Sequence, residues 1–129
     1  METINLTEKL LEAKAMEVAA FMEADFKAYC TRCYDETFED SMWAKEENHN
    51  RWKVTFEKGR NFFRFVRDGS CNGFLVINPP KGIDNKTGEG FNRGDLLMAK
   101  SWKAPAKNFA RGNVLDEGWE KNVRWTGVL

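Results

Sequence analysis

The first third of the chain has the apolar spacing of one long amphipathic helix. Its apolar side chains recur at steps of three and four residues, the period of a helix face: Leu11, Ala15, Val18, Met22, Phe26, Tyr29 and Cys33. Asn5 and Glu8 have the spacing of a capping box, and neither Gly nor Pro interrupts the segment that follows. This pattern predicts a helix from about Leu6 to Tyr34.

Residues 35–50 are polar and acidic and carry few large apolar side chains. The pattern allows a second short helix in this segment, with Ser41 as its cap and Phe38 packed on Met42 as a hydrophobic staple.

From Arg51 the apolar period changes to two, which is typical of half-buried strands. We predict a first strand over residues 51–57, a second over residues 60–67 and a third over residues 71–78. The dipeptide Asp68-Gly69 is a strong signal for a two-residue hairpin turn, and Pro79-Pro80 ends the third strand because neither proline can donate to a ladder.

The rest of the chain has shorter apolar segments. Residues 81–94 hold four glycines and predict a loop or an irregular hairpin. Residues 95–101 and 109–115 predict a fourth and a fifth strand, and residues 119–129 predict an edge strand. Short strands at this spacing usually close into a small barrel or a strongly bent sheet. The predicted fold is therefore mainly β with an N-terminal α-helix, and its core is a small, strongly bent five-stranded antiparallel barrel.

The length of 129 residues fits a single domain over residues 1–129. We divide it into an acidic helical segment (1–50), the barrel (51–115) and a C-terminal tail (116–129). The net charge of zero hides a strong asymmetry: residues 1–50 carry 5 Lys/Arg against 12 Asp/Glu, and residues 51–129 carry 15 against 8. The second part therefore predicts a basic surface, and basic surfaces attract polyanions.

Several function classes lack their sequence features. Apolar runs such as Phe74 to Ile77 are too short to span a bilayer, and the acidic first residues do not have the form of a secretory signal. The chain contains no Gly-x-Ser-x-Gly, phosphate-loop or Gly-x-Gly-x-x-Gly motif. We therefore expect neither an enzyme nor a cofactor, and no membrane partner.

Three cysteines fit a reducing compartment. Cys30, Cys33, His49 and Cys71 provide by number the four ligands of a zinc site. The pair Cys30-x-x-Cys33 lies on the predicted helix, however, where free cysteine usually behaves as a small apolar residue. We therefore expect structural thiols and no metal.

The most basic stretch runs from Lys100 to Asn113. The stretch contains four cations and no acidic residue, and two aromatic residues lie between the cations. The cations are Lys100, Lys103, Lys107 and Arg111, and the aromatic residues are Trp102 and Phe109. Cations can follow phosphates, and an exposed ring can stack on a base. The alternative is a solvated loop whose Trp102 and Phe109 face the core.

At these residues the chain resembles Sm-like RNA-binding proteins. The run from Phe109 to Val114 is similar to their second signature, and Val66, Asp68, Cys71 and Asn72 are similar to the first. Residues 94–113 also resemble an uncharacterised family of marine phage proteins of the cyanophage type, linked to the Sm-like fold. The resemblance covers about residues 51–115.

The resemblance implies base contacts by Asn72 and Arg111, with Asp68 as a support for Asn72. It also implies a homo-oligomeric ring and, for a phage protein, the cytoplasm of an infected host cell. The predicted function is binding of single-stranded nucleic acid, with RNA as the expected form, through Asp68, Asn72, Lys100, Trp102, Lys103, Lys107 and Arg111. The alternative is a non-enzymatic phage interaction or structural protein whose basic part binds an acidic protein partner.

Overall fold

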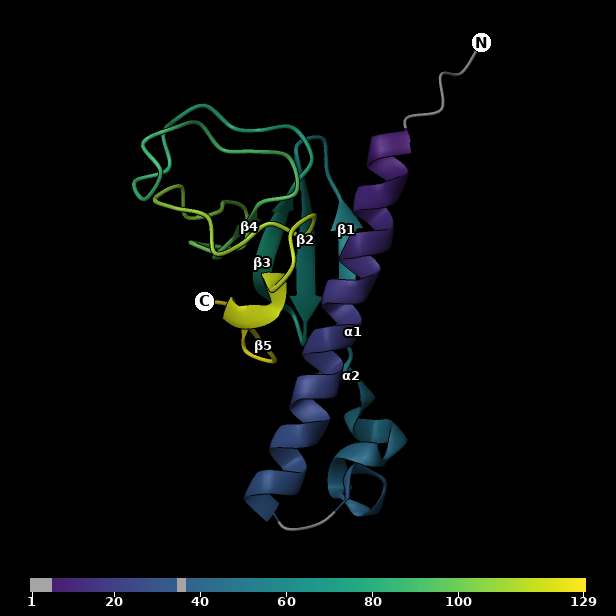
Figure 1. Cartoon of the computed structure of the whole chain (residues 1–129). Coiled ribbons are helices and arrows are strands. Elements are labelled where there is room, and N and C mark those ends of the chain that lie inside the picture. Colours follow the sequence, from purple (N-terminus) through teal and green to yellow (C-terminus); the bar gives the residue numbers. More distant parts are fainter. Residues whose placement is uncertain (1–5, 35–36) are drawn as a thin grey trace.

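A computed structural model describes residues 6–34 and 37–129, and Figure 1 shows a long helix beside a small sheet with extended loops. Helix α1 (Leu6–Tyr34) has the predicted bounds, while its expected cap Asn5 lies outside the described residues. Among the described residues, no helix is both long and apolar enough to cross a membrane.

The buried face of α1 follows the predicted stripe over most of its length. Leu11, Val18, Met22 and Phe26 are buried. At the C-terminal end the stripe continues through Cys30, which is fully buried, and the thiol of Cys33 is exposed. The prediction that Cys33 lies on the apolar face is wrong, because the buried positions from Met22 onward follow one another at steps of four residues.

The main sheet has four antiparallel strands in the order β1-β2-β3-β4: β1 (Thr55–Lys58), β2 (Phe62–Arg67), β3 (Ser70–Val76) and β4 (Leu96–Leu97). A second, two-stranded sheet pairs β5 (Val123–Arg124) with β6 (Gly127–Val128). The predicted turn at Asp68-Gly69 joins β2 to β3, and both residues have the positive φ that such a turn requires (50° and 75°).

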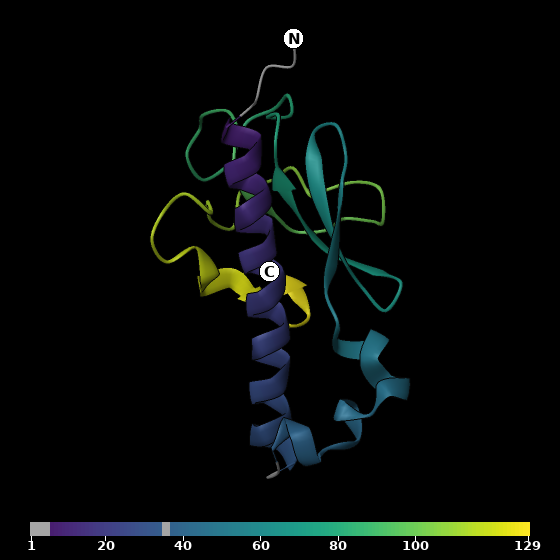
Figure 2. The same cartoon turned by 90° about the vertical axis from the view of Figure 1, so that its right-hand side faces the viewer.

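The period of two divides the side chains of the sheet between two cores. Phe63, Phe65 and Leu75 belong to the cluster that packs on α1. Phe74 and Val76 belong to a second cluster on the opposite face. Figure 1 shows α1 on one side of the sheet and the long loops on the other, and Figure 2 gives the view turned by 90°, with α1 running beside the strands. The sheet is thus covered by the helix on one face and by irregular loops on the other.

The predicted five-stranded barrel is wrong: the described residues form an open four-stranded sheet and a separate two-stranded one. The first strand begins only at Thr55, because Trp52 ends a short helix. Strand β4 has only two residues. The segment expected as the fifth strand lies beside β4 without forming a strand: the backbone N–H of Arg111 donates to the Leu96 carbonyl (2.8 Å), and that of Leu96 donates to the Gly112 carbonyl (2.8 Å). Barrel closure requires pairing on both edges of every strand, and β1 remains at an edge.

The segment after α1 consists of short helical turns. Three 3₁₀ turns (Phe38–Asp40, Met42–Ala44 and Glu46–Asn48) lead into α2 (His49–Trp52). Ser41 does not cap a helix with its side chain; its hydroxyl donates to the Phe38 carbonyl (2.6 Å). Met42 is exposed and Phe38 packs on Trp52 instead, with ring centroids 5.0 Å apart, so the predicted staple is absent from this described segment.

The C-terminal hairpin is fastened to both α1 and the main sheet. The backbone N–H of Trp125 donates to the Asp25 carboxylate (2.9 Å), and the Trp125 carbonyl accepts from the Asn72 side-chain amide (3.2 Å). Trp125 also packs at the edge of a third apolar cluster, formed by Phe26, Cys30 and Phe38. In Figure 1 the hairpin lies beside the middle of α1, at the lower end of the main sheet.

Candidate nucleic-acid interface

Three of the residues predicted to bind nucleic acid lie together on one tight loop. Residues 98–106 fold back on themselves through the bridge between Ala99 and Pro105, and the loop closes where Ala106 donates to the Met98 carbonyl (2.7 Å). Lys100, Trp102 and Lys103 lie at its tip and are exposed, with 40% of the Trp102 surface accessible to solvent. Trp102 therefore does not face the core, which was the alternative.

The tip of this loop lies against strand β2. The guanidinium carbon of Arg64 lies 4.8 Å from the centre of the Trp102 ring, a distance at which a cation and an aromatic face attract each other. Arg64 also forms an ion pair with Glu57 on β1 (Nη1 to Oε2, 3.0 Å). These two contacts hold the guanidinium between the sheet and the loop.

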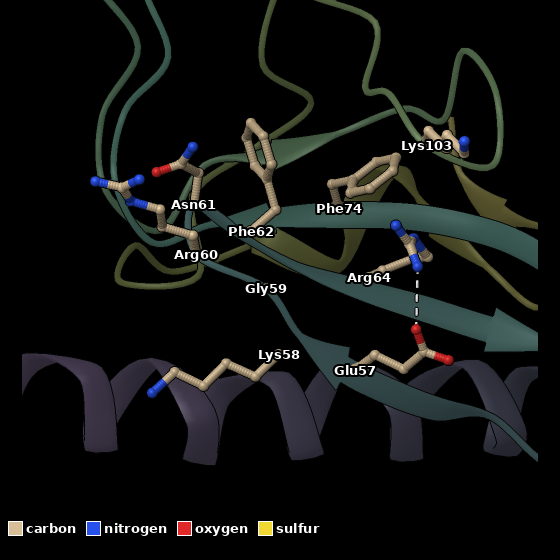
Figure 3. A pocket seen from close by; sticks show the side chains of 9 residues that line it. All are labelled: Glu57, Lys58, Gly59, Arg60, Asn61, Phe62, Arg64, Phe74 and Lys103. Carbon is tan, nitrogen blue, oxygen red and sulfur yellow. Dashed lines mark hydrogen bonds and ion pairs between the residues drawn. The ribbon is translucent and has the colours of Figure 1, made fainter.

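A pocket of about 240 Å³ opens beside this contact. Figure 3 shows Arg60 and Lys103 at different sides of the pocket, with Phe62 and Phe74 between them. Phe74 is buried and Phe62 is half-buried, and their rings meet edge to face at 5.7 Å. The pocket thus combines aromatic walls with cations at its rim.

The charge around the pocket is positive. Arg60, Arg64 and Lys103 line it together with one carboxylate, that of Glu57. The Lys58 side chain points toward α1 in Figure 3, where its ammonium pairs with Glu8 (3.2 Å). We name four cations and one ring here the cationic-aromatic surface: Arg60, Arg64, Lys100, Trp102 and Lys103. Arg64 is half-buried, and the other four residues are exposed.

Two predicted base-contacting residues are buried in the structure. The first, Asn72, lies in β3 and donates to the Trp125 carbonyl, and the second is Arg111. Asp68, the expected support of Asn72, is exposed at the β2–β3 turn and is not among the residues that line the pocket beside Trp102. The Arg111 guanidinium donates to the Asn108 side chain (2.6 Å) and to the Phe109 carbonyl (2.7 Å). The structure therefore assembles Lys100, Trp102 and Lys103, and it gives Asn72 and Arg111 internal partners.

Phe109 also has internal partners. The Arg111 guanidinium lies 3.8 Å and the Lys86 ammonium 4.2 Å from its ring centre. Burial lowers the pKa of Arg111, and the nearby Asp84 carboxylate opposes that shift. Lys107 is exposed between this cluster and the loop. Of the two aromatic residues in the basic stretch, Trp102 is thus the exposed one and Phe109 is half-buried.

The carboxylate of Asp84 connects the segment around Phe109 and Arg111 to the loop around Lys86. It accepts from the backbone N–H groups of Lys86 (2.7 Å) and Ala110 (2.9 Å). Burial raises the pKa of Asp84, but these hydrogen bonds and the charge of Lys86 lower it by more, so the pKa lies below its ordinary value. Asp84 therefore stays ionised at neutral pH and holds the two loops together through these hydrogen bonds.

Sequence reasoning missed Arg60 and Arg64. The alternation along residues 60–67 already placed Arg64 on the face of the strand opposite to Phe63 and Phe65. What the alternation does not contain is the contact with Trp102, which lies 38 positions further along and reaches Arg64 through an irregular loop.

The cysteines are dispersed. Cys30 is buried in the third apolar cluster, Cys33 is exposed, and Cys71 is half-buried with its pKa raised by burial. Within residues 6–34 and 37–129, no group of three or more His, Cys, Asp and Glu side chains is arranged to hold a metal ion.

The likeness to Sm-like and phage proteins therefore rests on the short sequence signatures alone, and the arrangement of strands differs from the one it implies. Comparison of the chain with protein-family models, with curated proteins and with solved structures finds no match.

Proposed function

We propose that the protein binds single-stranded nucleic acid, RNA in the first place, through the cationic-aromatic surface. The observation that carries the proposal is the cation–π contact between Arg64 and the exposed Trp102 beside a pocket lined by Arg60 and Lys103. Exposed cations follow a phosphate backbone, and a partly exposed indole offers a stacking face to a base. No catalytic step is included in the proposal.

Charge distribution supports the same surface. The chain is neutral overall, but its excess of Lys and Arg lies in residues 51–129, which supply the whole cationic-aromatic surface. A ligand that gains from this field is polyanionic. An acidic protein would gain from the cations in a similar way, but it has no planar base to stack on Trp102.

The salt dependence of binding tests the proposal. Each cation that neutralises a phosphate of a single strand contributes about −0.7 to the slope of log affinity against log salt. We expect the double variant Arg60→Ala/Lys103→Ala to flatten that slope by roughly 1–1.5 units with an oligouridylate. Trp102→Ala is expected to weaken binding by about 1–3 kcal/mol with the slope unchanged.

The matched control is Lys9→Ala/Lys45→Ala, which also removes two exposed cations but from segments outside the surface. It should leave the slope close to that of the unaltered protein. If the two double variants flatten the slope equally, binding follows net charge alone and the assignment of the surface is wrong. Binding of an acidic polypeptide that is weakened in Arg60→Ala/Lys103→Ala, with no binding of RNA or DNA, would favour the acidic partner.

The homo-oligomeric ring stays a prediction. An open sheet offers edges for pairing between subunits, and β1 is an edge strand with mostly exposed side chains. A ring would present several copies of the cationic-aromatic surface to one strand and raise the affinity without any new contact.

A further inference from the structure

A second pocket, of about 230 Å³, lies where α1, the turns after it and the C-terminal hairpin meet the β2–β3 turn. Its walls are aromatic: Phe26, Tyr29, Trp43 and Trp125. Two guanidinium groups, from Arg51 and Arg67, and the Asp68 carboxylate complete the lining. We call this the aromatic pocket. It shares no lining residue with the pocket beside Trp102.

The rings of the aromatic pocket are fixed by one another. Trp43 and Trp125 both meet Phe26 edge to face, with centroids 5.7 Å and 5.3 Å away, and Trp125 lies 5.1 Å from Tyr29. Phe26 is buried, while the other three rings are half-buried. Rigid, partly exposed rings provide a stacking site at little cost in conformational entropy.

The two arginines make the pocket selective for anions. Arg67 lies over Trp125 (5.1 Å to the ring centre) and Arg51 over Trp43 (5.8 Å). Arg67 Nη1 donates to the Arg51 carbonyl (2.8 Å), which holds the two residues side by side. An aromatic pocket without such charges would suit a cation, but here two guanidinium groups against one carboxylate repel it.

Arg67 is also incompletely satisfied. Within the described part of the chain its Nε is buried and has no hydrogen-bond partner. A buried donor without an acceptor destabilises the folded state. An anion that draws the guanidinium toward the pocket would offset part of that cost.

We infer that the aromatic pocket binds a nucleoside 5′-monophosphate, with the base among the rings and the phosphate on Arg51 and Arg67. Phosphate offers three terminal oxygens and suits two neighbouring guanidinium groups better than a carboxylate does. The volume of the pocket is below the roughly 300–1,000 Å³ of pockets for drug-sized ligands. A pocket of this size fits one ring system, which is the base of the nucleotide. The nucleotide can be free in solution or form the phosphorylated end of a strand, since both present the same chemistry. This site does not depend on the proposed function.

Calorimetric titration of the full chain with the four ribonucleoside 5′-monophosphates tests the inference. We expect one nucleotide per chain, with clearly weaker binding of the matching nucleosides and of inorganic phosphate. Arg67→Gln should weaken binding roughly 10- to 100-fold, the value of a lost charge-assisted hydrogen bond. Arg32→Gln, which removes a charge near the same end of α1 but outside the lining, should change it less than about twofold.

A second variant separates loss of the site from loss of the fold. Asp68 has a positive φ, which asparagine adopts readily, so Asp68→Asn keeps the turn. It removes a negative charge from the lining and should tighten nucleotide binding, whereas damage to the fold would weaken it. Inorganic phosphate binding as tightly as the nucleotides, or an unchanged affinity in Arg67→Gln, would overturn the inference.

Two further arms identify the source of the nucleotide and separate this site from the first. Competition by a 5′-phosphorylated trinucleotide but not by its 5′-hydroxyl form would identify a strand end, and competition by neither would identify the free nucleotide. Equal competition by both would show that the phosphate group is not recognised and would contradict the site. Arg60→Ala/Lys103→Ala should leave nucleotide binding unchanged, and a loss in that variant would move the binding to the other pocket.

Discussion

Replacing Phe26 with alanine is expected to lower the free energy of unfolding by about 3–5 kcal/mol. The Phe26 ring is buried and contacts Trp43 and Trp125 edge to face, so it joins α1 to the turns after it and to the C-terminal hairpin. Its removal leaves a cavity where these three segments meet. Chemical denaturation followed by tryptophan fluorescence or circular dichroism measures the loss.

Met16→Ala is the control, because Met16 lies on the same helix with its side chain exposed. Its effect should stay within about 0.5 kcal/mol. A loss of similar size in both variants would show that the stability of α1 arises from helix propensity rather than from packing of its buried face.

Gly127→Ala is expected to cost about 3 kcal/mol or more, the sum of backbone strain and a collision. Gly127 has a φ of 135°, and a Cβ built on it collides with the carbonyl oxygen of Asn72. That carbonyl belongs to β3, a strand between two neighbours in the main sheet, and cannot move without disturbing it. The substitution should therefore detach the C-terminal hairpin, which hydrogen exchange of the Trp125 amide would detect.

Gly69→Ala separates the two contributions to this cost. Gly69 also has a positive φ (75°), but a Cβ there meets nothing within 4 Å. Its cost should be about 1–2 kcal/mol, the price of the left-handed conformation alone. If Gly127→Ala costs no more than Gly69→Ala, the close approach of the hairpin to β3 is absent in solution.

The local patterns predicted the elements whose partners are near in sequence. The period of α1 and the Asp68-Gly69 turn predicted one helix and one hairpin, because both depend on residues a few positions apart. The same period of two divided Phe62 and Phe63 between opposite faces of the sheet. These features arise from hydrophobic burial on a regular backbone, which a sequence displays directly.

The barrel was wrong because closure depends on contacts between distant segments. The residues around Gly112 contact β4 through a few separate backbone hydrogen bonds and do not form a regular ladder with it. The loops are held by side-chain hydrogen bonds of Asp84 and Arg111. Irregular segments of this kind have no periodic pattern. The apolar residues at both ends of 109–115 were therefore compatible with a strand that does not form.

The candidate sites show the same division. Lys100, Trp102 and Lys103 are neighbours in sequence and were predicted together, whereas Arg64 joins them across the fold. The aromatic pocket combines residues of α1, the 3₁₀ turns, β2 and the C-terminal hairpin, so no single motif contains it. Burial of Asn72 and Arg111 likewise depends on the position of the C-terminal hairpin and of the loop around Asn108.

The most direct test of the central claim is a nuclear magnetic resonance titration of the full chain with a 5′-hydroxyl oligouridylate at about 50 mM salt, where phosphate contacts are strong. The chain has five tryptophans, and each indole N–H reports on its own surroundings. We expect the Trp102 indole signal and the backbone signals of residues 58–64 and 98–107 to shift in proportion to binding, with Trp119 unchanged. Absence of binding, or shifts that leave Trp102 and these two segments unaffected, would contradict the account.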